Sequence, residues 1–217
     1  MSAEGSPEPT RTRVKVCGLT NRGDAAFAIE HGADWLGFIV HGDSPRRIDA
    51  RQVAAILATL PRVEAVAVMV APSPAQALEL ASLAGASRIQ LHGIDSSAWP
   101  ADFPVPLHVS VGVDERGALT APLPPDTHLL HLDTSRGGRE GGTGQPFPWS
   151  IASDLARTRS LVLAGGLGPD NVAEALRIVR PFAVDASSRL EASPGIKDPE
   201  RVRRFLDAVR EHDAQDA

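Results

Sequence analysis

Short runs of apolar, often β-branched residues alternate along the chain with longer segments in which apolar residues recur three and four positions apart. The short runs are typical of strands buried on both faces, and the longer segments of amphipathic helices. Eight strands are predicted in this way, at residues 13–17, 34–40, 63–70, 87–91, 106–112, 127–133, 160–165 and 182–187. Helical segments lie between them, and the two after the fourth and fifth strands are short and rich in proline.

This alternation of strands and helices predicts a parallel sheet, either open or closed into a barrel. Eight is the number of strands that closes a barrel, and about 200 residues is the lower edge of that fold's usual size. An open sheet would be expected to carry a G-x-G-x-x-G fingerprint after its first strand, and the sequence has none there. We therefore predict one (β/α)8 TIM barrel over residues 13–212, with a disordered leader at 1–12 and a flexible tail at 213–217.

The composition fits a protein that folds around its own core in the cytoplasm. With 217 residues, 42% of them hydrophobic, the chain can bury a core without metals or disulfides. The formal net charge of −5 argues against a nucleic-acid partner, and no apolar run reaches the roughly 18 residues that cross a bilayer. The single cysteine cannot form an internal disulfide, which favours a reducing compartment. The first twelve residues lack the apolar region of a secretory signal, and a monomer is the default expectation.

Chemistry is expected at the C-terminal ends of the strands, where barrels of this kind place their active sites. Cys17 ends the first predicted strand and Asp133 ends the sixth. Because residues i and i+2 of a strand share a face, Lys15 and Cys17 are predicted to point into the barrel together. A thiol and a carboxylate across the barrel mouth can act as base and acid on one substrate. The alternatives are that Cys17 is only a small buried hydrophobe and that Asp133 caps a turn.

The loops after the last two strands carry residues suited to phosphate. Gly165 and Gly166 allow a close approach of the backbone, and Ser187 and Ser188 add hydroxyl donors. Barrels of this fold commonly bind phosphate at these two loops, so a phosphorylated small molecule is the predicted substrate. The serines could instead cap a short helix. The glycine-rich connection at residues 136–144 is predicted to form a mobile lid.

A buried ion pair is predicted beneath the catalytic layer. The first and eighth strands adjoin when a barrel closes, and Lys15 and Asp185 both lie on inward faces. Buried charges persist when they are paired, so the two side chains are expected to contact each other. His92 and His131 are interpreted as packing or hydrogen-bonding residues rather than metal ligands.

Six stretches of the chain match a known pattern in order, from residue 14 to 198. They are "KVCGLT", "GADWLGFIV…SPRRI", "QLHG", "LLHLDTS…GGTG", "LAGGLGPDNV" and "VDASSRLEASPGIKD". With these motifs the chain resembles the phosphoribosylanthranilate isomerase family of tryptophan biosynthesis.

The resemblance implies a barrel that carries out an Amadori rearrangement of N-(5-phosphoribosyl)anthranilate without a metal or organic cofactor. By motif, Asp133 would be the acid that opens the ribose ring, and Cys17 the base that takes the C2′ proton. Arg46 would bind the anthranilate carboxylate, which a guanidinium matches bidentately; Arg47 is the competing ligand, and a solvated surface role for Arg46 stays open. The further substrate-binding residues implied are Gly142, Gly144, Gly165, Gly166, Ser187 and Ser188.

Asp43, Pro148 and Arg189 depart from the family pattern, and Asp43 places a negative charge near the entry of an anionic substrate. Three rival functions make other demands on the sequence. A metal-dependent sugar-phosphate epimerase needs a converging cluster of histidines and carboxylates, but His92 and His131 lie on the fourth and sixth strands with no clear partners. A Schiff-base aldolase needs an inward lysine near the mouth, but Lys15 lies a layer below Cys17 and Lys197 lies beyond the eighth strand. A non-catalytic barrel that binds a phosphoribosyl ligand has no reason to keep Cys17 and Asp133 together.

Overall fold

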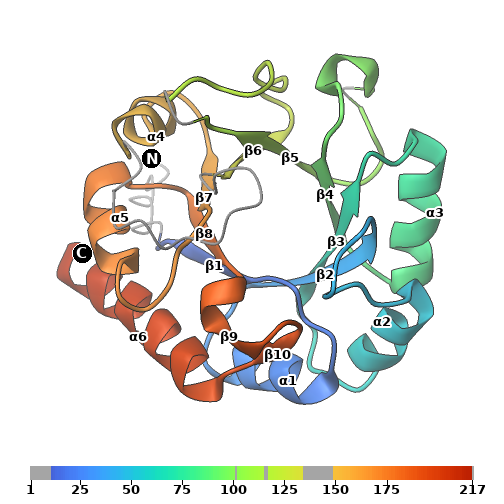
Figure 1. The fold of residues 1–217 in the computed structure, drawn as a ribbon, viewed down its shortest axis with the longest axis horizontal. Coiled ribbons are helices and arrows are strands. Elements are labelled where there is room, and N and C mark those ends of the chain that lie inside the picture. Colours follow the sequence, from blue (N-terminus) through green and yellow to red (C-terminus); the bar gives the residue numbers. More distant parts are fainter. Residues whose placement is uncertain (1–10, 101, 115–116, 134–148, 217) are drawn as a thin grey trace, which may run out of the picture.

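Eight parallel strands form a closed barrel in the order β1 to β8, and β1 pairs with β8 to complete the ring. The computed structural model describes residues 11–100, 102–114, 117–133 and 149–216. The strands are β1 Arg13–Val16, β2 Trp35–His41, β3 Glu64–Val70, β4 Arg88–His92, β5 Leu107–Gly112, β6 Leu129–Asp133, β7 Leu161–Ala164 and β8 Ala183–Ala186. Figure 1 looks down this barrel, with helices outside the strands. The predicted TIM-barrel fold is confirmed.

Six helices surround the barrel in the described residues, and side-chain caps mark the starts of several of them. They are α1 Arg22–Glu30, α2 Ala50–Leu57, α3 Pro74–Ala84, α4 Trp149–Ala156, α5 Val172–Val179 and α6 Pro199–Asp216. Asn21 and Ser73 accept hydrogen bonds from the backbone amides of Asp24 and Gln76, which fixes the starts of α1 and α3. After β8 the chain forms the short 3-10 turn η2 Ser188–Leu190 and a hairpin of β9 Glu191–Ser193 with β10 Ile196–Lys197. This hairpin lies beside α1 in Figure 1.

Two of the predicted helices are absent from the described residues. Between β4 and β5 there is only the 3-10 turn η1 Ser96–Ala98, and the described residues between β5 and β6 contain no helix. Prolines explain the difference, because each one removes a backbone donor and clashes with the preceding turn of a helix. They cluster in both connections, at positions 100, 104 and 106 and again at 122, 124 and 125.

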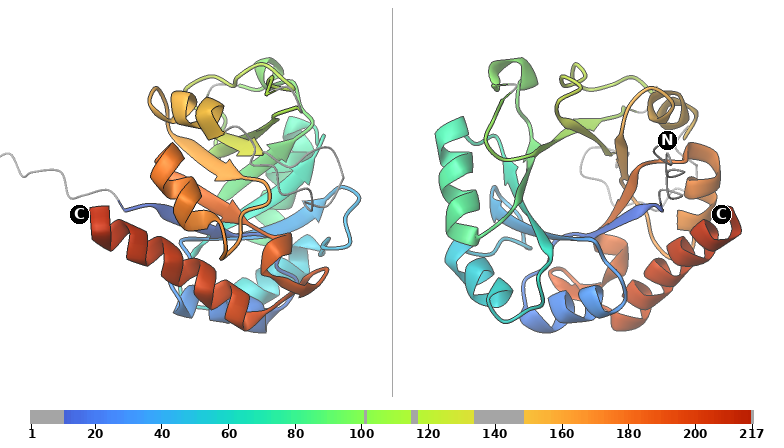
Figure 2. Two further views of the ribbon diagram at one scale, coloured as in Figure 1. Left: turned by 60° about the vertical axis from the view of Figure 1, so that its left-hand side comes forward. Right: turned by 180° about the vertical axis from the view of Figure 1, so that it is seen from behind.

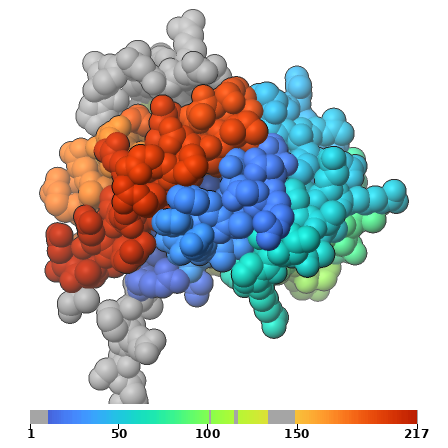
Figure 3. Space-filling view, turned by 90° about the horizontal axis from the view of Figure 1, so that it is seen from below, coloured from blue at the N-terminus to red at the C-terminus, as the bar shows by residue number. Residues whose placement is uncertain are grey.

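The predicted ends of the folded unit need correction. Helix α6 continues to Asp216, so the segment 213–216, predicted as a flexible tail, is helical. Asp213 on this helix accepts hydrogen bonds from the backbone amide and hydroxyl of Thr12 at 2.9 Å. Arg11 forms an ion pair with Asp34. Arg11 and Thr12, both in the predicted leader, therefore contact the folded unit. Figure 2 shows the long α6 along the outside, and Figure 3 shows the C-terminal segment against the blue N-terminal part that includes α1.

Alternate residues of the strands face two separate cores, as the period of two predicted. An inner cluster fills the barrel: Cys17, Trp35, Val66, Val68, Val162 and Ala183. The residues between them in phase belong to the layer under the helices: Val14, Val16, Leu130, Leu132, Val184 and Ala186. The predicted orientations of the first, sixth and eighth strands are thus confirmed. Within the described residues, no helix combines the length and apolar character that crossing a bilayer requires.

Candidate active site

Cys17 stands immediately after β1, inside the barrel and at its C-terminal end. Its backbone amide donates to the carbonyl of Ala186 at 2.9 Å, which fixes the residue to β8, and the side chain is buried. The neighbouring strand β2 makes room for it with Gly37. A Cβ at Gly37 would lie 2.7 Å from Cys17 Sγ and 3.0 Å from Lys15 Nζ, so the thiol occupies the space that a side chain would otherwise fill.

The predicted ion pair lies directly beneath this thiol. Lys15 and Asp185 are opposite each other in the register of β1 and β8, and Lys15 Nζ donates to Asp185 Oδ2 at 2.7 Å. His131 from β6 joins them, with its Nε2 3.1 Å from the same carboxylate oxygen. Lys15 is completely inaccessible and Asp185 is buried, so the prediction of a buried pair is confirmed.

Burial and charge act in opposite directions on these groups. Burial raises the pKa of the Cys17 thiol, while the charge of Lys15 opposes that rise. For Asp185, burial would raise the pKa of the carboxyl, but Lys15 and His131 outweigh it and lower the pKa to about 2. Burial would lower the pKa of Lys15, yet Asp185 and Cys17 together raise it. The lysine therefore stays cationic next to the thiol, where its charge limits the rise in the pKa of Cys17 that burial causes, without reversing it.

Asp133 is the last residue of β6 and is half-buried at the mouth. In the register of the sheet it lies opposite Gly112 on β5 and Ala164 on β7. It shares its face with His131 two residues earlier, and His131 reaches Asp185 in the middle of the barrel. Cys17 shares its face with Lys15 in the same way. The thiol and the Asp133 carboxylate thus stand one layer above the same buried cluster, on β1 and β6.

His92 belongs to a hydrogen-bonded group at the ends of β4 and β5. Gln90 Nε2 lies 2.9 Å from His92 Nε2 and 3.1 Å from the hydroxyl of Ser110. Burial and the neighbouring His131 lower the pKa of His92 to about 4, so the ring is neutral at pH 7. Both His92 and His131 form hydrogen-bonding contacts, as predicted. No group of three or more histidine, cysteine or acidic side chains in the described residues is arranged to hold a metal ion.

The loops after β7 and β8 meet at the predicted phosphate site. Gly165 and Gly166 have φ values of +92° and +66°, in the region that favours glycine. A Cβ at Gly166 would meet nothing within 4 Å, so the loop has open space beside it. Asn171 orders the loop by donating to the carbonyl of Gly166 at 3.0 Å and accepting from the amide of Gly168 at 2.8 Å.

The other loop contributes Ser187 and the turn η2, which starts at Ser188. The side chain of Arg189 lies against Gly168, where a Cβ would be 2.9 Å from its Nε. This contact brings the two loops together. Arg189, a departure from the family pattern, therefore lies at their junction. The predicted positions Gly142 and Gly144, Pro148 and the whole predicted lid lie outside the described residues.

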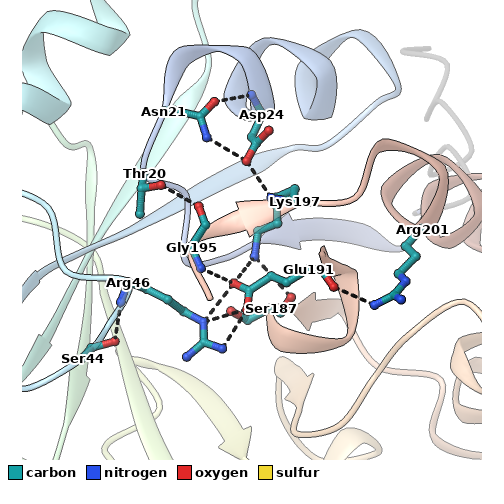
Figure 4. A network of polar contacts seen from close by, with 10 residues as sticks. All are labelled: Thr20, Asn21, Asp24, Ser44, Arg46, Ser187, Glu191, Gly195, Lys197 and Arg201. Carbon is teal, nitrogen blue, oxygen red and sulfur yellow. Dashed lines mark hydrogen bonds and ion pairs between the residues drawn. The ribbon is translucent and has the colours of Figure 1, made fainter. Parts of the chain in front are cut away.

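Arg46, in the loop after β2, does not stand alone at the surface. Glu191 of the hairpin binds it bidentately, with Arg46 Nε 2.9 Å from Oε1 and Nη2 2.7 Å from Oε2 (Figure 4). Lys197 Nζ donates to the same carboxylate at 2.9 Å and to the carbonyl of Ser187 at 3.2 Å. Arg47, the alternative ligand, is exposed, as is Asp43.

Sequence reasoning missed three residues of this site: Gly37, Glu191 and Lys197. The glycine gave no signal, because its role depends on a side chain of the neighbouring strand. Glu191 and Lys197 lie within the matched stretch "VDASSRLEASPGIKD". Lys197 is also one of only two lysines in the chain, which could have marked it as a position with a special role.

Comparisons with known proteins agree with this geometry. A sequence profile described as "N-(5'phosphoribosyl)anthranilate (PRA) isomerase" matches residues 14–208. The N-(5'-phosphoribosyl)anthranilate isomerase of Pseudomonas fluorescens is 39% identical over 203 residues, covering 91% of this chain and 98% of the relative. The enzyme of the same name from Geobacter sulfurreducens is 40% identical over 199 residues, covering 89% and 96%.

Solved structures give the same answer. The phosphoribosyl anthranilate isomerase of Thermotoga maritima superposes with a TM-score of 0.79 at 36% identity, over 92% of this chain and 99% of that one. A phosphoribosyl anthranilate isomerase in complex with reduced 1-(o-carboxyphenylamino)-1-deoxyribulose 5-phosphate superposes with a TM-score of 0.76 at 34% identity, over the same shares. The chain therefore belongs to the N-(5'-phosphoribosyl)anthranilate isomerase family.

Proposed function

We propose that Cys17 is the general base and Asp133 the general acid in the family's reaction, the isomerisation of N-(5'-phosphoribosyl)anthranilate in tryptophan biosynthesis. Asp133 gives its proton to the ribose ring oxygen, the C1′–O bond breaks, and the nitrogen lone pair forms an iminium ion. The Cys17 thiolate then takes the C2′ proton, and the released electron pair forms a C1′=C2′ enolamine. Return of a proton to C1′ and loss of the C2′ hydroxyl proton complete the ketose, so the product is an isomer of the substrate.

One observation carries this proposal: the Cys17 thiol and the Asp133 carboxylate lie above the same buried cluster. Cys17 and Asp133 stand one layer above Lys15 and His131, which meet at the carboxylate of Asp185. Burial raises the pKa of Cys17, and the cation beneath the thiol offsets part of that rise, which helps the deprotonated form that a base requires. Two groups held over one buried cluster from different strands can act on opposite sides of a substrate at the barrel mouth.

The substrate's two anionic ends have matching residues on either side of that mouth. We infer that phosphate binds at the loops of Gly165, Gly166, Ser187 and Ser188, because Gly166 faces open space and the loops adjoin. Arg46 supplies the guanidinium for the anthranilate carboxylate. The solved relative that contains a reduced product analogue with both a carboxyl and a phosphate supports a ligand of this kind.

Replacing the two reacting groups tests the assignment. Cys17→Ala and Asp133→Asn should each lower kcat by about 10²–10⁴-fold, the usual contribution of general acid–base catalysis, measured by loss of anthranilate fluorescence. Both variants should bind the reduced product analogue within a few-fold of the parent and keep its circular dichroism spectrum. With substrate deuterated at C2′, Cys17→Ala should also release no deuterium to the solvent. A variant that keeps more than a tenth of the parent kcat would disprove its assigned role.

The proposal also includes a reaction without a cofactor, a location in the cytoplasm and a monomeric state. These three parts rest on the sequence. For the oligomeric state a relative points the other way, since the enzyme of Thermotoga maritima is dimeric. A metal-dependent epimerase, unlike the proposed enzyme, would lose activity in the presence of a chelator.

A further inference from the structure

Glu191 is a buried carboxylate at the barrel mouth that accepts hydrogen bonds from several groups. It is 4% exposed and accepts hydrogen bonds from Arg46, from Lys197 Nζ at 2.9 Å and from the backbone amide of Gly195 at 3.4 Å. Burial alone would raise the pKa of Glu191, but hydrogen bonds from Arg46 and Lys197 lower it. The carboxylate is therefore ionised and fixed from three sides, and no step of the reaction uses it.

The charges of this cluster do not cancel. Arg46 and Lys197 are two cations around one anion, Glu191, so these three side chains together carry one positive charge. The Lys197 side chain is buried, and the backbone amide of Lys197 donates to Asp24 at 2.7 Å, which holds the lysine in place from the α1 side. If Glu191 were paired with Arg46 alone, the carboxylate would neutralise the guanidinium. With Lys197 present, a net positive charge remains to attract an anion.

The position of Arg46 is also fixed sterically. Gly18, with φ of +74°, lies against its side chain, and a Cβ there would be 2.8 Å from Arg46 Cδ and 2.8 Å from Ser187 Oγ. The tip of the hairpin is tied to the loop after β1, since the Thr20 hydroxyl donates to the carbonyl of Gly195 at 2.5 Å. Figure 4 shows these segments converging on Glu191. A flexible arginine is thereby held in one orientation.

We propose that Glu191 is a positioning residue for substrate recognition: together with Lys197 it orients Arg46 and keeps its charge available for the substrate carboxylate. This rests on the proposed role of Arg46. Preorganising the guanidinium removes the side-chain entropy cost of binding. Because Lys197 also binds the carbonyl of Ser187, the same hairpin ties the carboxylate end of the site to the phosphate end.

The test compares two ligands that differ only in the carboxyl group. They are reduced 1-(o-carboxyphenylamino)-1-deoxyribulose 5-phosphate and its counterpart with an unsubstituted phenyl ring, each titrated by calorimetry. Glu191→Gln should weaken binding of the carboxylated ligand by about 10- to 100-fold, the range for a hydrogen bond to a charged group, and that of the phenyl ligand by less than threefold. KM should rise with kcat nearly unchanged, since the carboxylate is bound equally in substrate and transition state.

Lys197→Met should give the same selective loss of affinity for the carboxylated ligand, because it removes a positive charge. This variant decides the question if Glu191→Gln does not fold. Glu64→Gln is the matched control, because Glu64 also binds an arginine, Arg88 at 3.0 Å, but at the start of β3 on the opposite end of the barrel. This control should leave both affinities unchanged.

Arg46→Ala separates the two levels of the argument. If this variant binds both ligands as the parent does, the proposed role of Arg46 is wrong. If Arg46→Ala loses the preference for the carboxylated ligand but Glu191→Gln and Lys197→Met keep it, the positioning role of Glu191 alone is overturned. A loss that is equal for both ligands in Glu191→Gln would also overturn it, since this indicates a general structural defect.

Discussion

Replacing Lys15 by methionine should destabilise the protein far more than removing a surface charge. Methionine fills a similar volume but leaves the Asp185 carboxylate, 7% exposed, with His131 as its remaining partner in the barrel. Removing one member of a buried ion pair costs about 3–5 kcal/mol of unfolding free energy. For a chain of this length each kcal/mol shifts the melting temperature by about 2–4 °C, so a drop of roughly 6–20 °C is expected.

The loss should depend on pH in a defined direction. In the parent protein the pKa of Asp185 is lowered to about 2 from an ordinary 3.8. A lowered pKa contributes stability that is present above 3.8 and is lost as the pH falls toward 2, here about 2 kcal/mol. Without Lys15, burial raises the pKa of this carboxyl instead. The difference in unfolding free energy between parent and variant should therefore narrow as the pH falls from the raised pKa of the variant, above 3.8, toward 2.

Urea unfolding followed by tryptophan fluorescence and circular dichroism measures both effects. Arg203→Met is the control, because Arg203 forms its ion pairs with Glu200 and Asp207 on the exposed face of α6, and no measurable change is expected. The double variant Lys15→Met with Asp185→Asn should recover much of the loss, since it removes both charges. An unfolding free energy of Lys15→Met within error of the parent at pH 7 would refute the reasoning.

Four further outcomes test the proposals made above. Gly37→Ala should lower kcat by about 10²-fold, as a displacement of about 1 Å can do, because its Cβ would contact Cys17 Sγ at 2.7 Å; an unchanged kcat would show that the thiol has room to spare. Inorganic phosphate should inhibit competitively, and Ser188→Asp should abolish that inhibition through charge repulsion; equal inhibition of both proteins would place the anion elsewhere. Treatment with a chelator should leave turnover unchanged, whereas a loss restored by a divalent metal would favour the epimerase class. Light scattering on a sizing column should give about the 22.9 kDa of one chain, and twice that mass would disprove the monomer.

The sequence predicted those parts of the molecule that depend on local period and order. Strand phase alone placed Lys15, Cys17 and Asp185 inside the barrel, because successive strand residues alternate between faces. The closing contact between the first and last strands then brought Lys15 and Asp185 together, 170 residues apart. The proline-rich connections, in turn, were the places where predicted helices failed to form, since proline overrides a weak helical pattern.

The contacts at the mouth could not be predicted from one sequence. Arg46 and Glu191 are 145 positions apart. Their pairing depends on a hairpin whose strands are three and two residues long and show no clear strand pattern in the sequence. In the sequence, nothing distinguishes Gly37 from other strand residues. Its role depends on the thiol of the neighbouring strand, which lies against it in the structure. Both cases depend on which side chains meet between elements, and neither propensity nor spacing contains that information.

The burial of both lysines has a practical consequence for studying this enzyme. Lys15 and Lys197 are the only lysines in the chain and are 0% and 3% exposed, so arginine supplies every cationic side chain on the outside. Reagents that acylate lysine amines, and proteases that cleave after lysine, should therefore find no side-chain target in the folded barrel. One lysine becomes reactive only when β1 separates from β8, and the other only when the hairpin lifts from the mouth. The chain thus carries two natural probes, read separately by mass spectrometry, for the opening of its catalytic layer and of its substrate entrance.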